Sequence, residues 1–179
     1  ALPRRTSVED LRQENFADLV RSGQSMMWRA GELIHLNSCY APTVDDELIP
    51  EHPIAAFENG HQHQVPLLIG TNSDEASFGK FLFQRQSSRE RAALRLLASF
   101  DPQHAPEVVA AYDGAVARED FAHLLADALF WAPSTRIATA HAKVAPTWMY
   151  RFDFASAVLK WLGLGAMHSL EPGNVFGDP

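Results

Sequence analysis

Two segments of the sequence carry a carboxylate and a histidine in settings suited to acid–base chemistry. Residues 66–75, P-L-L-I-G-T-N-S-D-E, place Glu75 directly after a short apolar run. Residues 163–168, G-L-G-A-M-H, place His168 in a glycine-rich stretch that can bend tightly. A carboxylate that accepts the Nδ1 proton of a histidine fixes the tautomer of the ring and stabilises the imidazolium form. The two residue types therefore have the chemistry of the acid and the base that activate a hydroxyl nucleophile.

Both residues also have structural interpretations, which the residues alone leave open. Glu75 begins a helical stretch, where the helix dipole stabilises a carboxylate. A lone histidine such as His168 is more often structural or solvent-facing than catalytic. Asp74 could replace Glu75 as the acid, but adjacent side chains cannot both face one partner, so we expect one of the two to be solvated.

The nucleophile is the missing member of this set. In α/β-hydrolases the chain order is nucleophile, acid, histidine, and the nucleophile lies in a G-x-S-x-G turn. The 179 residues contain no such motif. Three serines lie beside the acid or the histidine, but they lack this turn and we do not expect them to be nucleophiles: Ser73, Ser77 and Ser169. The sequence therefore predicts a nucleophile upstream of Ala1.

The elements expected to position these residues alternate between strand and helix. Residues 65–70 are a continuous apolar run typical of a strand buried on both faces of a parallel or mixed sheet, and residues 146–154 have strand-like alternation. Helices are expected at 7–23 with Ser7 as cap and Gly23 as end, 25–36, 53–60, 75–83, 88–100 with Ser88 as cap, 106–116, 120–131 and 134–144 after Pro133. Long helical runs between strands indicate an α/β fold.

Composition narrows the class of protein. A net charge of -7 argues against a nucleic-acid partner, because no basic stripe can neutralise phosphates. The single cysteine, Cys39, excludes an internal disulfide, and no apolar stretch reaches the roughly 18 residues of a membrane helix. No signal peptide is visible, which favours the cytoplasm without deciding the compartment. His61 and His63 lack a third ligand at a recognisable spacing, so we expect no metal site there.

Several aromatic residues could line an apolar acyl or alcohol pocket, although most of them are expected in the core. They are Trp28, Phe78, Phe81, Phe83, Phe130, Trp131 and Trp161.

Four ordered motifs give the chain a specific resemblance. Residues 42–50 are similar to P-x-x-D-G-x-x-L-P, with Asp46 in place of the glycine, and residues 65–75 to V-P-L-L-I-G-x-N-x-D-E. Residues 127–152 resemble a D-x-x-F…P…Y-x-Y/R-F stretch, and residues 165–177 resemble G-A-x-H-x-x-E-x-x-x-V-F-G. Together they resemble the type B carboxylesterases, the group that includes bacterial para-nitrobenzyl esterases and the cholinesterases.

The resemblance implies roles for the matching positions. Glu75 would be the triad acid, His168 the general base, and Glu171 a carboxylate that supports the site without taking part in the chemistry. Residues 1–179 would be one partial domain, the C-terminal portion of an α/β-hydrolase fold with a few strands and many covering helices, lacking the nucleophile half and the final helices. Two departures are Ala76, where glycine is common, and residues 172–174, which replace apolar and aromatic residues.

The implied function is hydrolysis of a small-molecule carboxylic ester by a serine acyl-enzyme mechanism. The resemblance implies no metal or organic cofactor, and the partner of this chain would be the N-terminal part of the same protein. The isolated chain would be inactive and could self-associate through an exposed sheet edge. The alternative is a non-catalytic recognition or adhesion module of the cholinesterase type.

Overall fold

The computed structural model describes residues 7–27 and 42–177, which belong to two units, residues 1–42 and 43–179. The first unit contains α1 (Val8–Arg12) and α2 (Phe16–Met27). Ser7 caps α1 as predicted, since its Oγ accepts from the Asp10 N–H at 3.1 Å and the Asp10 carboxylate accepts from the Ser7 N–H.

The single helix predicted for residues 7–23 is in fact these two helices. The chain breaks near Asn15, whose Oδ1 accepts a hydrogen bond from the Ala17 N–H at 2.9 Å and so satisfies one of the first donors of α2. Gly23 lies inside α2 and does not end it, because one interior glycine costs a helix only about 1 kcal/mol. The helix predicted for residues 25–36 falls mostly outside the described residues.

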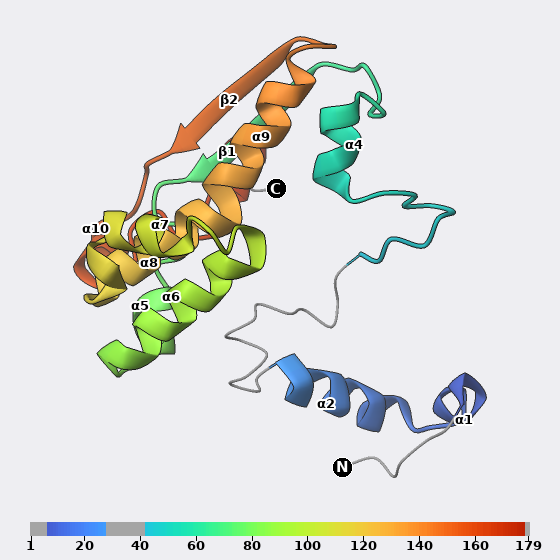
Figure 1. The fold of residues 1–179 in the computed structure, drawn as a ribbon, viewed down its shortest axis with the longest axis horizontal. Coiled ribbons are helices and arrows are strands. Elements are labelled where there is room, and N and C mark those ends of the chain that lie inside the picture. The colour runs from blue at the N-terminus through green and yellow to red at the C-terminus, as the bar shows by residue number, and fades with distance from the viewer. Residues whose placement is uncertain (1–6, 28–41, 178–179) are drawn as a thin grey trace. The chain divides into compact units, whose positions relative to one another are not determined.

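The second unit is rich in helix and contains two strands (Figure 1). Its elements in chain order are α4 (Pro53–Asn59), β1 (Leu67–Asn72), α5 (Gly79–Leu82), α6 (Gln86–Phe100), α7 (Ala105–Ala111), η1 (Asp113–Ala115), α8 (Arg118–Ala126), η2 (Asp127–Trp131), α9 (Ala132–His141), β2 (Thr147–Phe152), α10 (Ala157–Trp161) and α11 (Pro172–Phe176). This order, with two strands separated by a long helical run, agrees with the predicted α/β class.

The two strands pair in parallel, in a register that runs from Leu67 opposite Thr147 to Asn72 opposite Phe152. A parallel pair needs a crossover connection, and helices α5 to α9 provide it. Figure 1 shows α9 lying along the two strands, and α4 packs against α9. Both strands therefore end at the same edge, and the segments that carry Glu75 and His168 follow them there.

The prediction that the first strand is buried on both faces is wrong for the part of the chain that the structure describes. Leu68 is 64% exposed, and its direct partner across the sheet, Trp148, is 57% exposed. α9 contacts both strands, but no described element covers the side chains of these two residues. The predicted strand itself is confirmed, two residues further along the chain than expected.

A helical layer of α6, α7, η1 and α8 holds most of the buried core. Its largest fully buried side chains are Phe121 and Leu124. The buried guanidinium of Arg89 donates to the backbone carbonyls of Phe83, Gln84 and Val116. These hydrogen bonds compensate for the loss of water around the buried charge. α6 begins at Gln86, so Ser88 lies in its first turn and is not its cap.

The helices predicted at 120–131 and 134–144 run into one another through η2, a short π-helix. Pro133 has no N–H to donate and its ring crowds the preceding turn. The wider π turn before it lets the helix continue past the proline, which is why the predicted break is absent. Within residues 7–27 and 42–177, no helix combines the length and the apolar character that crossing a lipid bilayer requires.

Candidate active site

Glu75 lies in the turn that follows β1, at the carboxyl end of the parallel strand pair, where open α/β sheets place their sites. The last residue of β1, Asn72, donates its backbone N–H to Glu75 Oε1 at 2.8 Å. This bond folds the carboxylate back over the end of its own strand. The side chain is buried, so the direction in which its second oxygen points is set by the protein rather than by solvent.

That second oxygen, Oε2, lies 2.7 Å from Nδ1 of His168. The side chain of Glu75 is 7% exposed, whereas that of His168 is 53% exposed. A carboxylate on Nδ1 favours the tautomer with the proton on that nitrogen, which leaves Nε2, on the opposite side of the ring, as the acceptor. Phe130 supports the imidazole from the helical side, with ring centroids 4.9 Å apart.

Glu171 is connected to the site through Asn72 and makes no direct hydrogen bond to His168. The Asn72 side-chain amide donates to Glu171 Oε2 at 2.7 Å and to the Met167 carbonyl at 2.8 Å. The residue that ends β1 therefore ties down the chain on both sides of His168. Sequence reasoning named Glu171 but missed Asn72, because an asparagine after an apolar run gives no signal beyond an ordinary strand end.

The expectation that one of Asp74 and Glu75 is solvated is wrong. Asp74 is half-buried and its Oδ2 accepts hydrogen bonds from the Ala166 N–H at 3.0 Å and from Ser73 Oγ at 2.7 Å. The two adjacent carboxylates face different partners on the same loop. Ser73 and Ser77 do not contact His168, and no serine of the described residues hydrogen-bonds to it.

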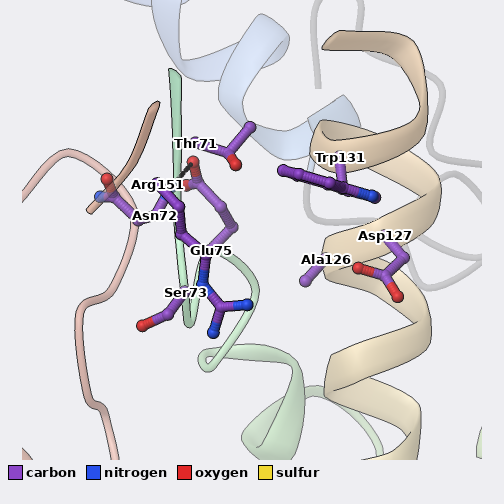
Figure 2. A pocket seen from close by; sticks show the side chains of 8 residues that line it. All are labelled: Thr71, Asn72, Ser73, Glu75, Ala126, Asp127, Trp131 and Arg151. Atoms are coloured by element: carbon purple, nitrogen blue, oxygen red, sulfur yellow. Dashed lines mark hydrogen bonds between the residues drawn. The ribbon is translucent and has the colours of Figure 1, made fainter. Parts of the chain in front are cut away.

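A cavity of about 290 Å³ lies beside Glu75, between the strand ends and the α8–η2 junction (Figure 2). Figure 2 shows Trp131 and Asp127 on its helical side, with Arg151 and Glu75 on the strand side. The Tyr112 hydroxyl donates to Asp127 Oδ2 at 2.5 Å. Burial, followed by this hydrogen bond to a carboxylate, raises the pKa of Tyr112 to about 12.

The aromatic residues that the sequence assigned mostly to the core are not buried. Phe83 and Phe130 are half-buried, the latter against His168, and the other four described ones are exposed: Phe78, Phe81, Trp131 and Trp161. Trp28 lies outside the described residues. Among the described aromatic residues, Phe130 contacts the His168 ring and Trp131 lines a cavity together with Glu75.

Several of the other described histidines have structural partners. His61 pairs with Glu51, His52 caps α4 through Nδ1, and Nε2 of the buried His141 lies 2.7 Å from the Val65 carbonyl. His63 is exposed. Within the described ranges, no three histidine, cysteine or acidic side chains cluster as metal ligands do.

Comparison with known proteins gives consistent matches along the chain. The sequence model of the carboxylesterase family matches residues 3–179. Para-nitrobenzyl esterase of Bacillus subtilis is 34% identical over 142 residues, which cover 78% of this chain and 28% of that protein. Pyrethroid hydrolase Ces2a of Mus musculus is 26% identical over 169 residues, covering 82% of this chain and 30% of the relative.

Solved structures agree with the sequence matches. A PNB esterase structure superposes with a TM-score of 0.75 at 28% identity, covering 95% of this chain and 35% of the esterase. A thermophilic PNB esterase gives a TM-score of 0.75 at 30% identity, covering 95% and 34% of the two chains. The chain thus spans about a third or less of the length of these relatives and has part of their α/β-hydrolase fold. The resemblance read from the four motifs is confirmed, and the chain belongs to the carboxylesterase family.

Proposed function

We propose that this chain supplies the acid and the general base of a serine-dependent carboxylic ester hydrolase. The observation that carries the proposal is the contact of 2.7 Å between Glu75 Oε2 and His168 Nδ1. It joins a buried carboxylate to a half-exposed imidazole, so the acid is shielded while the base is accessible. This is the arrangement that a Ser-His-acid triad requires of its last two members.

The proposed reaction proceeds through an acyl-enzyme. As a serine Oγ attacks the ester carbonyl, His168 Nε2 takes the hydroxyl proton and Glu75 stabilises the resulting imidazolium. His168 then gives that proton to the departing alkoxide, which leaves as the alcohol. In the second half, His168 takes a proton from water as the water attacks the acyl-serine, and returns it to the serine Oγ as the carboxylic acid leaves.

The serine and the oxyanion donors are proposed to come from polypeptide outside this sequence. The sequence has no G-x-S-x-G motif, and the relatives are about three times as long as the matched region. The exposed pair Leu68 and Trp148 supports this, because parallel sheets normally have both faces covered. On this proposal residues 1–179 are part of one hydrolase domain, and the isolated chain hydrolyses no ester.

The proposed substrate class is a small-molecule carboxylic ester. The relatives carry the names para-nitrobenzyl esterase, pyrethroid hydrolase and acylcarnitine hydrolase, all of which indicate hydrolysis. None of these names favours the alternative of a non-catalytic recognition module, and the paired acid and histidine would have no chemical use in one.

Glu75→Gln tests the proposal in the protein that contains this chain, together with any polypeptide joined or bound to it in its source. Glutamine keeps the shape but loses the charge that stabilises the imidazolium. We expect kcat/KM for p-nitrophenyl acetate to fall by about 10⁴-fold, as triad acids do elsewhere. Glu107→Gln, at an exposed position on α7, is the matched control and should change the rate by less than about twofold. Equal rates for the two variants would overturn the proposal.

A further inference from the structure

The loop that carries His168 is held by the last residue of β1 and the short segment that follows it. Lys80 Nζ donates to the Gly163 carbonyl at 2.8 Å, the Asn72 amide donates to the Met167 carbonyl, and Glu75 contacts His168 itself. Residues 72–80 therefore contact and hold residues 163–171. Because the His168 side chain is half-exposed, packing alone does not fix the ring, and the position of its backbone must be set by these anchors.

Asp74 makes two further contacts with this loop, both to the backbone of Ala166. Its N–H donates to the Ala166 carbonyl at 3.1 Å, and the Ala166 N–H donates back to Asp74 Oδ2 at 3.0 Å. The first of these bonds belongs to a parallel bridge between Asp74 and Met167, the residue immediately before His168, and the second is made by the Asp74 side chain. One aspartate thus holds the chain in both directions, two residues ahead of the imidazole.

Gly165 has no side chain, and this leaves the space that the Asp74 carboxylate occupies. Its φ is +58°, and a Cβ placed there would lie 2.3 Å from Asp74 Oδ2 and 2.4 Å from Asp74 Cγ. A side chain at this position would be strained by the backbone and would also push the carboxylate away. Ser169, on the other side of His168, has a φ of +64°, so the loop contains a strained residue that only firm anchoring maintains.

We propose that Asp74 and Gly165 form a lock that positions His168. Asp74 is a positioning residue: it holds the backbone at Ala166 so that His168 Nδ1 meets Glu75, and glycine at 165 is required for the carboxylate to approach. The lock rests on the proposed function, in which His168 is the base. It assigns to Asp74 a role in the site that the adjacent acid, Glu75, cannot fulfil, since both oxygens of Glu75 are already engaged.

The test is the tautomer of His168, read by ¹⁵N NMR of the full chain with labelled histidine, with His168→Asn assigning the signal. In the parent chain the proton should reside on Nδ1. Asp74→Ala should lower the Nδ1-H to Nε2-H ratio by about tenfold or more, because loss of the anchor releases Nδ1 from a charged acceptor. Asp74→Asn, which keeps an oxygen acceptor, should retain the parent ratio. Asp45→Ala is the control, since Asp45 also accepts backbone N–H groups but in a loop without a histidine contact.

Gly165→Ala tests the lock from its other side and should produce the same loss. The double variant Asp74→Ala/Gly165→Ala should lose no more than either single one, because the two act through one contact. An unchanged tautomer in Asp74→Ala or Gly165→Ala would overturn the lock. The lock would also be overturned if both single variants unfolded while Asp74→Asn stayed folded. A contact that acts only on this loop should leave the α6–α8 layer intact. If the protein proves to hydrolyse no ester, the proposed function fails while this NMR result still stands or falls by itself.

Discussion

At the residue scale, each carboxylate oxygen of Glu75 has its own partner and its own role. Oε1 accepts the backbone N–H of Asn72, which fixes the acid to the end of β1, while Oε2 meets His168 Nδ1. The carboxylate is therefore already oriented towards His168 in the absence of substrate. In a buried site such preorganisation is what makes a fixed charge effective, because no solvent has to reorganise as the imidazolium forms.

Tyr112 gives a pH-dependent prediction. Its pKa is raised to about 12 by burial and by Asp127, so the folded state favours the neutral phenol. The stability that this contributes is fully present below the ordinary tyrosine pKa of about 10 and is lost as the pH rises towards 12. Urea unfolding at pH 9 and pH 11 should show this loss in the parent chain, and Tyr112→Phe should lack it.

The same variant should be less stable by about 1 kcal/mol at pH 7, because its hydrogen bond to Asp127 is gone. Tyr150→Phe is the control, and absorbance at 295 nm should still show the ionisation near pH 12 in it. An identical pH dependence in Tyr112→Phe and the parent would contradict the assignment.

At this scale the sequence predicted the residues but not their partners. The V-P-L-L-I-G-x-N-x-D-E and G-A-x-H patterns identified Glu75 and His168, which the fold brings to 2.7 Å, although their catalytic role stays a proposal. One of Asp74 and Glu75 was expected in solvent because adjacent side chains cannot both face one partner. They do diverge, but Asp74 turns towards the Ala166 backbone, which only the folded loop brings within reach.

At the scale of elements, the β1–β2 pair is the part on which the site depends. Gly70 and Tyr150 are direct partners in the register, and the Tyr150 ring lies across the glycine. A Cβ at position 70 would lie 2.1 Å from Tyr150 Cζ. The small residue in an otherwise bulky strand therefore makes room for an aromatic neighbour, which is a recurring use of glycine in strands.

Gly70→Ala should consequently destabilise the chain by about 1–2 kcal/mol, since the added methyl must displace the ring. In a Tyr150→Ala background the same substitution should be neutral or slightly stabilising, because alanine is better suited to a strand than glycine. Chemical denaturation of the four chains of this cycle measures both numbers. A cost that is the same in both backgrounds would show that Tyr150 is not the obstacle.

Long periodic elements were predictable and their junctions were not. Residues 53–60 and 146–154 were placed correctly because a proline start, a glycine end and a strand alternation are local signals. The η2 turn depends on how the helix passes Pro133 while keeping Phe130 against His168. The position of Phe130 depends on a residue of the histidine loop that is distant in sequence. The local pattern around Pro133 therefore could not predict η2.

At the scale of the whole molecule, the sheet of the described residues consists of two parallel strands, one face of which is partly open. Apolar runs such as residues 65–70 were expected to be buried on both faces, which holds for parallel sheets whose other layers are present. In the described chain Leu68 and Trp148 lie open instead. The sequence could predict the strand but not what covers it, and self-association through an exposed sheet edge stays a prediction.

The rate of ester hydrolysis by His168→Asn is the most direct test of the central claim that His168 and Glu75 are the base and acid of a carboxylesterase. The assay uses p-nitrophenyl acetate and the protein that contains this chain in its source. Its control is His63→Asn, which alters an exposed histidine that is not among the residues lining the cavity beside Glu75. The account predicts a loss of about 10⁶-fold in kcat for His168→Asn and almost none for the control. Retention of activity within about tenfold of the parent, in a protein that hydrolyses the ester, would contradict it.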